Sequence, residues 1–220
     1  MSPSFPVLPS RASGRALVAV ATLLLVATLL GACTISRPYA VKGTFLLEPT
    51  LPAAAPAASV KPASLRVGVV NVAAPFRGKT FVYRESDLRY EADYYDEFFI
   101  APTALLSTAT ANAIAAAKVF KRVVPFGAVA DDSDYVLDGF VSELYGDIRN
   151  PATPTAVLTI TFYLSPLSVP GPAVIWSHEY QQRVPIAGTG PEALAKAWNT
   201  ALSAILADLA RDLATAELPK

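Results

Sequence analysis

Residues 155–165, with the sequence TAVLTITFYLS, alternate between apolar and mostly hydroxyl side chains. Successive side chains of a β-strand point to opposite faces, so this alternation predicts a half-buried strand. One face of the strand carries hydroxyls, namely Thr155, Thr159, Thr161 and Ser165. The face predicted to meet the core carries Ala156, Leu158, Ile160, Phe162 and Leu164.

The segments on both sides of this strand predict further strands. Two long ones are expected at 134–146, with a bulge at Gly139, and at 173–185. The second is expected to turn Val174, Trp176, Tyr180 and Val184 inward. A compact apolar run at 64–72 predicts a buried strand, two exposed strands are expected at 80–85 and 87–93 with a turn near Ser86, and a brief strand at 120–124.

Two segments have the periodicity of amphipathic helices. One runs from about Pro102 to Lys118, with Thr103 as the expected N-cap, and residues 94–100 are expected to lead into it. The other begins at a predicted capping box, residues 189–192, and continues to the C-terminus. Their apolar stripes are Leu106, Ala109, Ala113, Ile114 and Ala117 in the first helix, and Leu194, Trp198, Ala201, Leu202, Ile205, Leu209 and Leu213 in the second. The predicted fold class is therefore α+β, a largely antiparallel β-sheet with two main α-helices packed on one face.

The N-terminus has the layout of a secretory signal. Arg11 and Arg15 precede an uncharged apolar run at 16–30, and two small residues then precede Cys33. The run is short for a membrane span, which needs about 20 apolar residues. We therefore expect a signal peptide at 1–32, a tether at 33–63 with a short strand at 44–48 and a Pro/Ala-rich linker, and an α+β domain at 64–220.

Leu30-Gly31-Ala32-Cys33 resembles the bacterial lipobox. The resemblance implies that the peptide is cut before Cys33, and that acyl groups such as palmitate and a diacylglycerol group are attached to this residue. An ordinary signal peptide and an uncleaved anchor are the alternatives. Lipid chains would hold the protein on a membrane, and Thr34, which is not Asp, favours the periplasmic face of the outer membrane in Gram-negative sorting.

Several segments resemble the ABC-type transport auxiliary lipoproteins, the PqiC-like family. They are the lipobox, the Phe45–Pro49 strand (FLLEP), the Val-rich 65–69 segment, the 81–84 strand with its arginine, the start of the 134–137 strand and the closing helix. A tryptophan that the family often places before the first helix is absent, and Phe98 and Phe99 stand there. The resemblance implies an accessory periplasmic domain that assists an ABC permease and ATPase with an MCE-type substrate-binding protein. The implied cargo is phospholipid or another hydrophobic molecule, and a homo-oligomer is left open.

The composition and motifs give little support for catalysis or for nucleic-acid, metal or cofactor binding. The formal net charge is zero, which offers no electrostatic basis for nucleic-acid binding. His178 is the only histidine and is expected at the edge of the core, and no Gly-x-Ser-x-Gly motif is present. We therefore expect no catalytic residue, no metal site and no cofactor apart from the lipid on Cys33. An envelope hydrolase centred on a buried His178 is the minor alternative.

An aromatic cluster interleaved with charges is the candidate partner-facing or lipid-facing surface. Packing beneath the first helix is the alternative for these side chains. Two acidic groups, Glu91/Asp93/Asp96/Glu97 and Asp131/Asp132/Asp134, are expected to be solvated, with a weak calcium site as the alternative. The candidate surface residues are Tyr83, Arg84, Tyr90, Tyr94, Tyr95, Phe98 and Phe99.

The function that these observations favour is that of a non-enzymatic accessory lipoprotein. It would act by tethering and protein–protein docking within an ABC/MCE-type transport system. A structural outer-membrane lipoprotein or envelope assembly factor without a transporter is the alternative.

Overall fold

The structure is a computed structural model that describes residues 18–19, 41–56, 60–128, 132–167 and 173–218. Cys33 and the predicted signal peptide, apart from residues 18–19, lie outside the described residues. Residues 41–220 form one compact unit. Within the described ranges, no helix combines the length and the apolar character needed to cross a bilayer.

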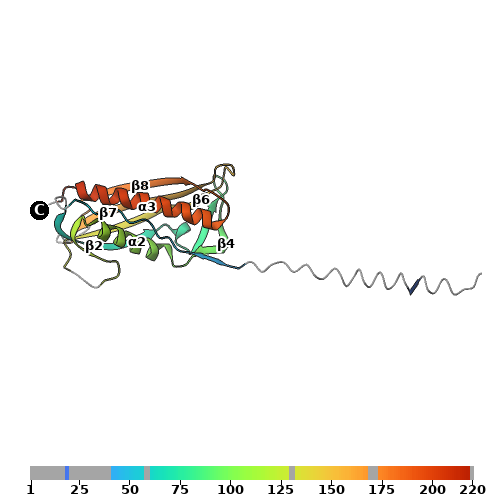
Figure 1. Cartoon of the computed structure of the whole chain (residues 1–220), viewed down its shortest axis with the longest axis horizontal. Helices are drawn as coiled ribbons and strands as arrows, with labels where there is room; N and C mark the ends of the chain where they lie inside the picture. The colour runs from blue at the N-terminus through green and yellow to red at the C-terminus, as the bar shows by residue number, and fades with distance from the viewer. Residues whose placement is uncertain (1–17, 20–40, 57–59, 129–131, 168–172, 219–220) are drawn as a thin grey trace, which may run out of the picture. The chain divides into compact units, whose positions relative to one another are not determined.

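The described residues of this unit form eight strands and two α-helices. Figure 1 shows how these elements are arranged. The helices are α2 (Pro102–Ala117) and α3 (Pro191–Thr215), and a short 3-10 turn, η2, covers Ala74–Phe76. The strands are β1 (Gly43–Phe45), β2 (Lys61–Val72), β3 (Thr80–Arg84), β4 (Tyr90–Phe98), β5 (Phe120–Val124), β6 (Tyr135–Asp147), β7 (Thr155–Pro166) and β8 (Trp176–Pro185).

β6 is the centre of the sheet. On one edge it pairs with β7, and β7 pairs with β8, in two long antiparallel ladders. Its other edge is shared by two strands placed end to end: β2 pairs with the first part of β6, and β3 pairs at Gly146 and Asp147. β5 extends the β2 branch, whereas β4 and then β1 extend the β3 branch. The four parallel pairings are short, so the sheet is mixed and mostly antiparallel, and the predicted fold class is confirmed.

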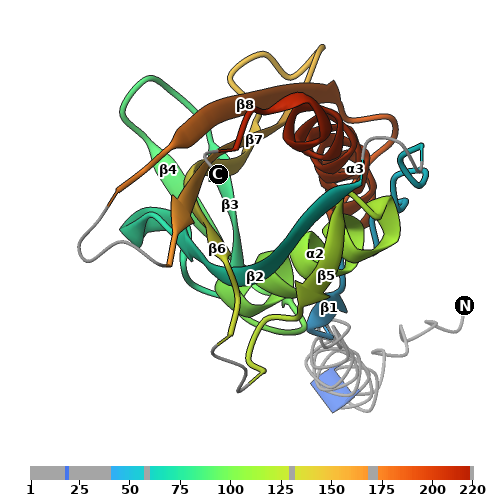
Figure 2. The same cartoon turned by 90° about the vertical axis from the view of Figure 1, so that its left-hand side faces the viewer.

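The two helices cover one face of the sheet, which curves around them (Figure 2). α3 packs on β7 and β8, α2 packs on β2 and β5, and the helices contact each other. All residues of the two predicted apolar stripes are buried, as are the five predicted core-facing residues of β7. Trp198 is fully buried at the centre, where its ring meets Phe81 and Phe98, and its Nε1–H donates to the Val157 carbonyl at 3.2 Å.

The helix starts differ from the predicted caps. Ala101 is the N-cap of α2 and Gly190 that of α3, and neither helix has a side-chain cap. In both cases a proline occupies the first turn, where its missing N–H costs nothing, so the prolines rather than the hydroxyl residues define the starts. Gly190 has φ +82°, a conformation that favours glycine.

The predicted bulge at Gly139 is absent from the β6–β7 ladder. There Gly139 pairs regularly with Phe162, and the register shift falls between Val141 and Glu143. In the β2–β6 ladder, however, a register shift does lie next to Gly139, with the extra residue on β2 between Val67 and Val70. A Cβ at position 139 would lie 3.2 Å from both Phe162 and Val70, so close packing also favours glycine here.

His178 lies on the predicted face of β8, beside Tyr180, with 4.6 Å between the ring centroids, but it is exposed. The Tyr180 hydroxyl donates to Asp212 at 2.7 Å, close to the end of α3 at Thr215. The helix therefore ends before it can cover His178. Val174 is likewise exposed, because β8 begins only at Trp176.

Candidate functional site

The hairpin of β3 and β4 carries a large bulge. Thr80 pairs with Glu97 and Val82 with Ala92, so residues 93–96 lie opposite Phe81 alone. The Asp93 Oδ1 atom accepts the backbone N–H of Tyr95 at 2.8 Å and that of Asp96 at 3.0 Å. The carboxylate thus satisfies two amides that the ladder has released. Residues 93–96 are called the tyrosine bulge below.

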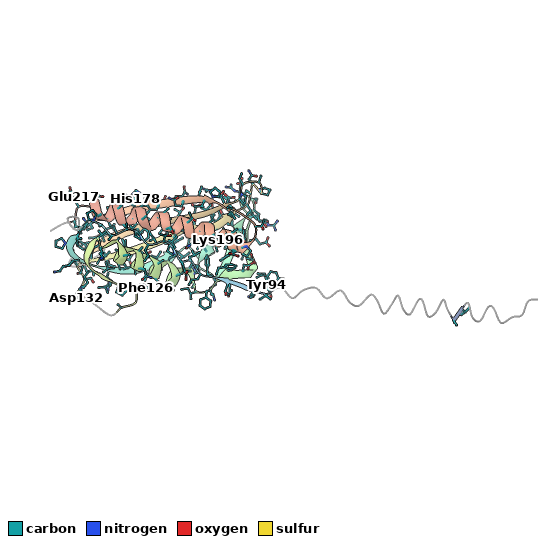
Figure 3. The ribbon with its side chains drawn as sticks, viewed as in Figure 1. Tyr94, Phe126, Asp132, His178, Lys196 and Glu217 are labelled. Atoms are coloured by element: carbon teal, nitrogen blue, oxygen red, sulfur yellow. The ribbon has the colours of Figure 1, made fainter. Side chains whose placement is uncertain are left out.

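The tyrosine bulge holds two aromatic side chains out in solvent. Tyr94 is 76% exposed and Tyr95 is 46% exposed. Their rings pack edge to face at 5.0 Å, and the Lys42 Nζ lies 5.5 Å from the Tyr94 centroid. Figure 3 places Tyr94 at the opposite end of the domain from Asp132 and Glu217, and far from His178.

Beside the bulge is a hollow of about 340 Å³ lined by Tyr83, Tyr94, Tyr95 and Ile148 together with the acidic side chains of Glu85, Glu91 and Asp93. Burial, followed by the nearby charges of Asp93 and Asp96, raises the pKa of Tyr83 to about 12. Burial and then Asp93 also raise the pKa of Asp96. The site therefore combines tyrosines with an excess of negative charge.

The other predicted surface residues do not join this site. The Arg84 guanidinium donates to the Ser86 and Asp87 carbonyls and lies 5.5 Å from the Tyr90 ring. Tyr90 in turn packs against Phe76 and Tyr145. Arg84 therefore stabilises the hairpin and its loop, and Tyr90, although 43% exposed, belongs to a second aromatic group.

Phe98 was a candidate surface residue, with packing beneath the first helix as the alternative, and the structure places it in the core. It is 2% exposed and packs between Phe81 and Trp198. β4 continues to Phe98 instead of giving way to a helical lead-in, so strand alternation turns Phe98 inward and Phe99 outward. Phe99 is 62% exposed. β3 also differs from the prediction of an exposed strand, because Phe81 and Val82 are buried.

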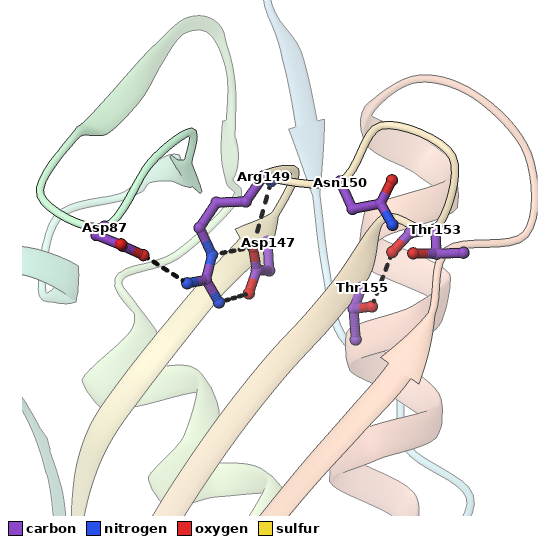
Figure 4. Close-up of a pocket in the computed structure, with 6 residues that line it drawn as sticks. All are labelled: Asp87, Asp147, Arg149, Asn150, Thr153 and Thr155. Carbon is purple, nitrogen blue, oxygen red and sulfur yellow. Dashed lines mark hydrogen bonds and ion pairs between the residues drawn. The ribbon is translucent and has the colours of Figure 1, made fainter.

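A partly buried ion pair beside the loop between β3 and β4 was not predicted (Figure 4). Arg149 Nε and Nη2 donate to the two oxygens of Asp147 at 2.9 and 2.8 Å, and Arg149 Nη1 reaches Asp87 at 2.9 Å. These hydrogen bonds lower the pKa of Asp147 to about 2. The pair joins the β3–β4 loop to the end of β6. The only sequence signal was the Asp-x-Arg spacing.

The predicted acidic groups are mostly occupied by local partners. Glu91 pairs with Arg89, Glu97 with Lys79, and Asp132 with Arg122. Asp134 accepts both the N–H and the hydroxyl of Ser64, while Asp131 lies outside the described residues. Across the described ranges, no group of three His, Cys, Asp or Glu side chains is arranged to hold a metal ion.

The fold and the site together define a class of protein: a mixed-sheet α+β domain that presents an aromatic bulge. The chain belongs to the family of ABC-type transport auxiliary lipoprotein components, whose model matches residues 45–210. The resemblance found in the sequence is thereby confirmed. The family is an auxiliary part of transport systems and is not a known enzyme family.

Solved structures share the fold. The chain is similar to protein XCC0632 of Xanthomonas campestris, described as a DUF330 protein, with a TM-score of 0.67 and 18% identity over 77% of this chain and 94% of that one. An uncharacterized protein gives a TM-score of 0.61 at 15% identity over 79% and 99% of the two chains. No curated protein matches the chain.

Proposed function

We propose that the protein is a lipid-anchored accessory subunit of an ABC transport system that contains an MCE-type substrate-binding protein. Acyl groups on Cys33 would hold it at the periplasmic face of the outer membrane, as one copy or as a homo-oligomer. It would act by tethering and by protein–protein docking within the system, which moves phospholipid or another hydrophobic molecule. Membership of the transport auxiliary family supports the general role.

The tyrosine bulge is the observation that carries the docking proposal. Tyrosine and other aromatic side chains dominate the binding energy of many interfaces. Here Asp93 holds the backbone of the bulge in one shape through two hydrogen bonds, so little conformational entropy would be lost on binding. The surrounding carboxylates favour a partner surface that carries lysine or arginine.

Replacing both Tyr94 and Tyr95 by alanine is expected to weaken the partner complex about 30-fold, the equivalent of about 2 kcal/mol. The domain should stay folded, because both side chains are exposed. The measurement is co-purification with, and titration against, the MCE-type subunit of the same cell. Raised ionic strength should slow association, since the site is acidic.

Leu88→Ala is the matched control, because Leu88 is 94% exposed in the same hairpin but away from the bulge. A second pair of variants separates the effect of the shape of the bulge from that of its side-chain contacts. Asp93→Asn keeps an acceptor for the two amides and should retain binding better than Asp93→Ala, which removes it. Full binding by the double tyrosine variant would refute docking through the bulge.

The gene neighbourhood discriminates between the two functional hypotheses. Genes for an ABC ATPase, a permease and an MCE protein beside this one would support the proposal. An isolated gene would favour a structural envelope lipoprotein.

A further inference from the structure

An apolar groove separate from the tyrosine bulge lies between the segment that follows β1 and helix α2. Its volume is about 400 Å³, a size typical of small-ligand sites. The polar residues at the groove are Glu48, Thr108 and Asn112, and Glu48 is the only ionisable one. The rest of the lining is apolar: Leu46, Leu47, Pro49, Leu51, Ile100, Leu105 and Ala109.

The segment that follows β1 forms the outer wall of the groove, and hydrogen bonds to α3 fix this wall in place. The Thr50 N–H donates to the Ser203 hydroxyl at 2.9 Å, and Asn199 Nδ2 donates to the Glu48 carbonyl at 2.9 Å. The groove is therefore formed before any ligand arrives, and a ligand need not order its wall.

The groove leaves large apolar side chains in water. Leu46 is 49%, Leu51 51% and Ile100 36% exposed, although Leu47 and Leu105 behind them are buried. Covering such a surface with hydrocarbon is favourable at about 25 cal/mol per Å². With few polar groups and one carboxylate, the lining suits an uncharged alkyl chain and offers little to a polar or anionic ligand.

The position of the groove in the chain brings it near a membrane. Cys33 precedes Leu46 by thirteen residues, which span at most about 45 Å when fully extended. A lipid on Cys33 would thus keep the groove close to a bilayer surface and its lipids.

We propose that this groove binds one alkyl chain of a membrane lipid. The lipid is a separate molecule, not the anchor on Cys33, because an anchor chain that left the bilayer for the groove would weaken the attachment of the protein to the membrane, whereas the bilayer supplies other lipids in large excess. The inference extends the proposed function and depends on it for the membrane anchor. It gives the protein a direct contact with a hydrophobic cargo.

Photo-cross-linking tests the proposal on the full lipidated protein in vesicles. In the first arm, the vesicles contain phosphatidylethanolamine with a diazirine in one acyl chain. In the second arm, the diazirine fatty acid is in the Cys33 anchor and the vesicle lipids are ordinary. Peptide mapping by mass spectrometry locates the cross-links, and the mass of the N-terminal peptide reports separately whether Cys33 is lipidated.

Cross-links to segments 46–51 and 100–112 in the first arm are expected. Thr108→Trp, an exposed position at the groove, and Leu51→Gln should each lower the yield about tenfold. Leu88→Gln, the same substitution outside the groove, should leave it unchanged. An absence of these cross-links, their appearance in the anchor arm alone, or equal yields from the groove variants and the wild type would overturn the proposal.

Discussion

Replacing Trp198 by alanine is expected to lower the free energy of unfolding by about 3–5 kcal/mol. The side chain is fully buried, its ring lies 4.9 Å from that of Phe81 and 5.3 Å from that of Phe98, and it joins α3 to β3, β4 and β7. Its removal leaves a cavity and deprives the buried Val157 carbonyl of its indole donor. Urea unfolding followed by circular dichroism measures the loss.

Trp176→Ala is the matched control, because Trp176 is only partly buried at the start of β8. Its loss should cost no more than about 1 kcal/mol. Equal effects of the two substitutions would show that Trp198 is not the centre of the core.

Asp147→Asn is expected to destabilise the domain by about 2 kcal/mol near neutral pH. The Asp147 side chain is 10% exposed, and the Arg149 hydrogen bonds lower its pKa from 3.8 to about 2. A carboxyl group with a depressed pKa stabilises the fold above its unfolded pKa. This stabilisation is lost as the pH falls through the folded pKa. The difference between wild type and variant should therefore shrink from about pH 4 to about pH 2.

Urea midpoints at several pH values measure this difference. Asp87→Asn removes the other carboxylate bound to Arg149, but its side chain is 87% exposed, so the expected loss is below about 0.5 kcal/mol. A pH-independent difference between wild type and Asp147→Asn would contradict the assignment of the stabilisation to the Asp147 charge.

The parts of the fold predicted correctly are those in which apolar side chains recur with a regular period. The predicted core-facing residues of β7 and the predicted stripes of α2 and α3 are all buried. Burial also extends beyond them, to Val157 and Thr159 in β7 and to most of α2. β5 was predicted with the bounds that the structure shows. Periodicity carries no information on which strands pair, and for this reason the end-to-end placement of β2 and β3 along β6 was not foreseen.

The site was predicted only in part, because side-chain hydrogen bonds replace regular pairing there. Asp93 withdraws two amides from the β4 ladder, which lets the strand resume at Asp96 and continue to Phe98. The aromatic cluster was thus correctly recognised as unusual, but its division into Tyr94 and Tyr95 in solvent and Phe98 in the core depends on a bulge with no periodic signal. The groove was missed for a similar reason, since its outer wall has no regular secondary structure.

The claim on which the proposed function depends most is that the protein is held at a membrane by lipid on Cys33 while its tyrosine bulge docks a partner. The intact mass of the protein isolated from membranes of its native host tests the anchor directly. We expect a chain that begins at Cys33 and carries a diacylglyceryl and an acyl group. An unmodified Cys33 thiol on protein recovered from the soluble fraction would contradict the account.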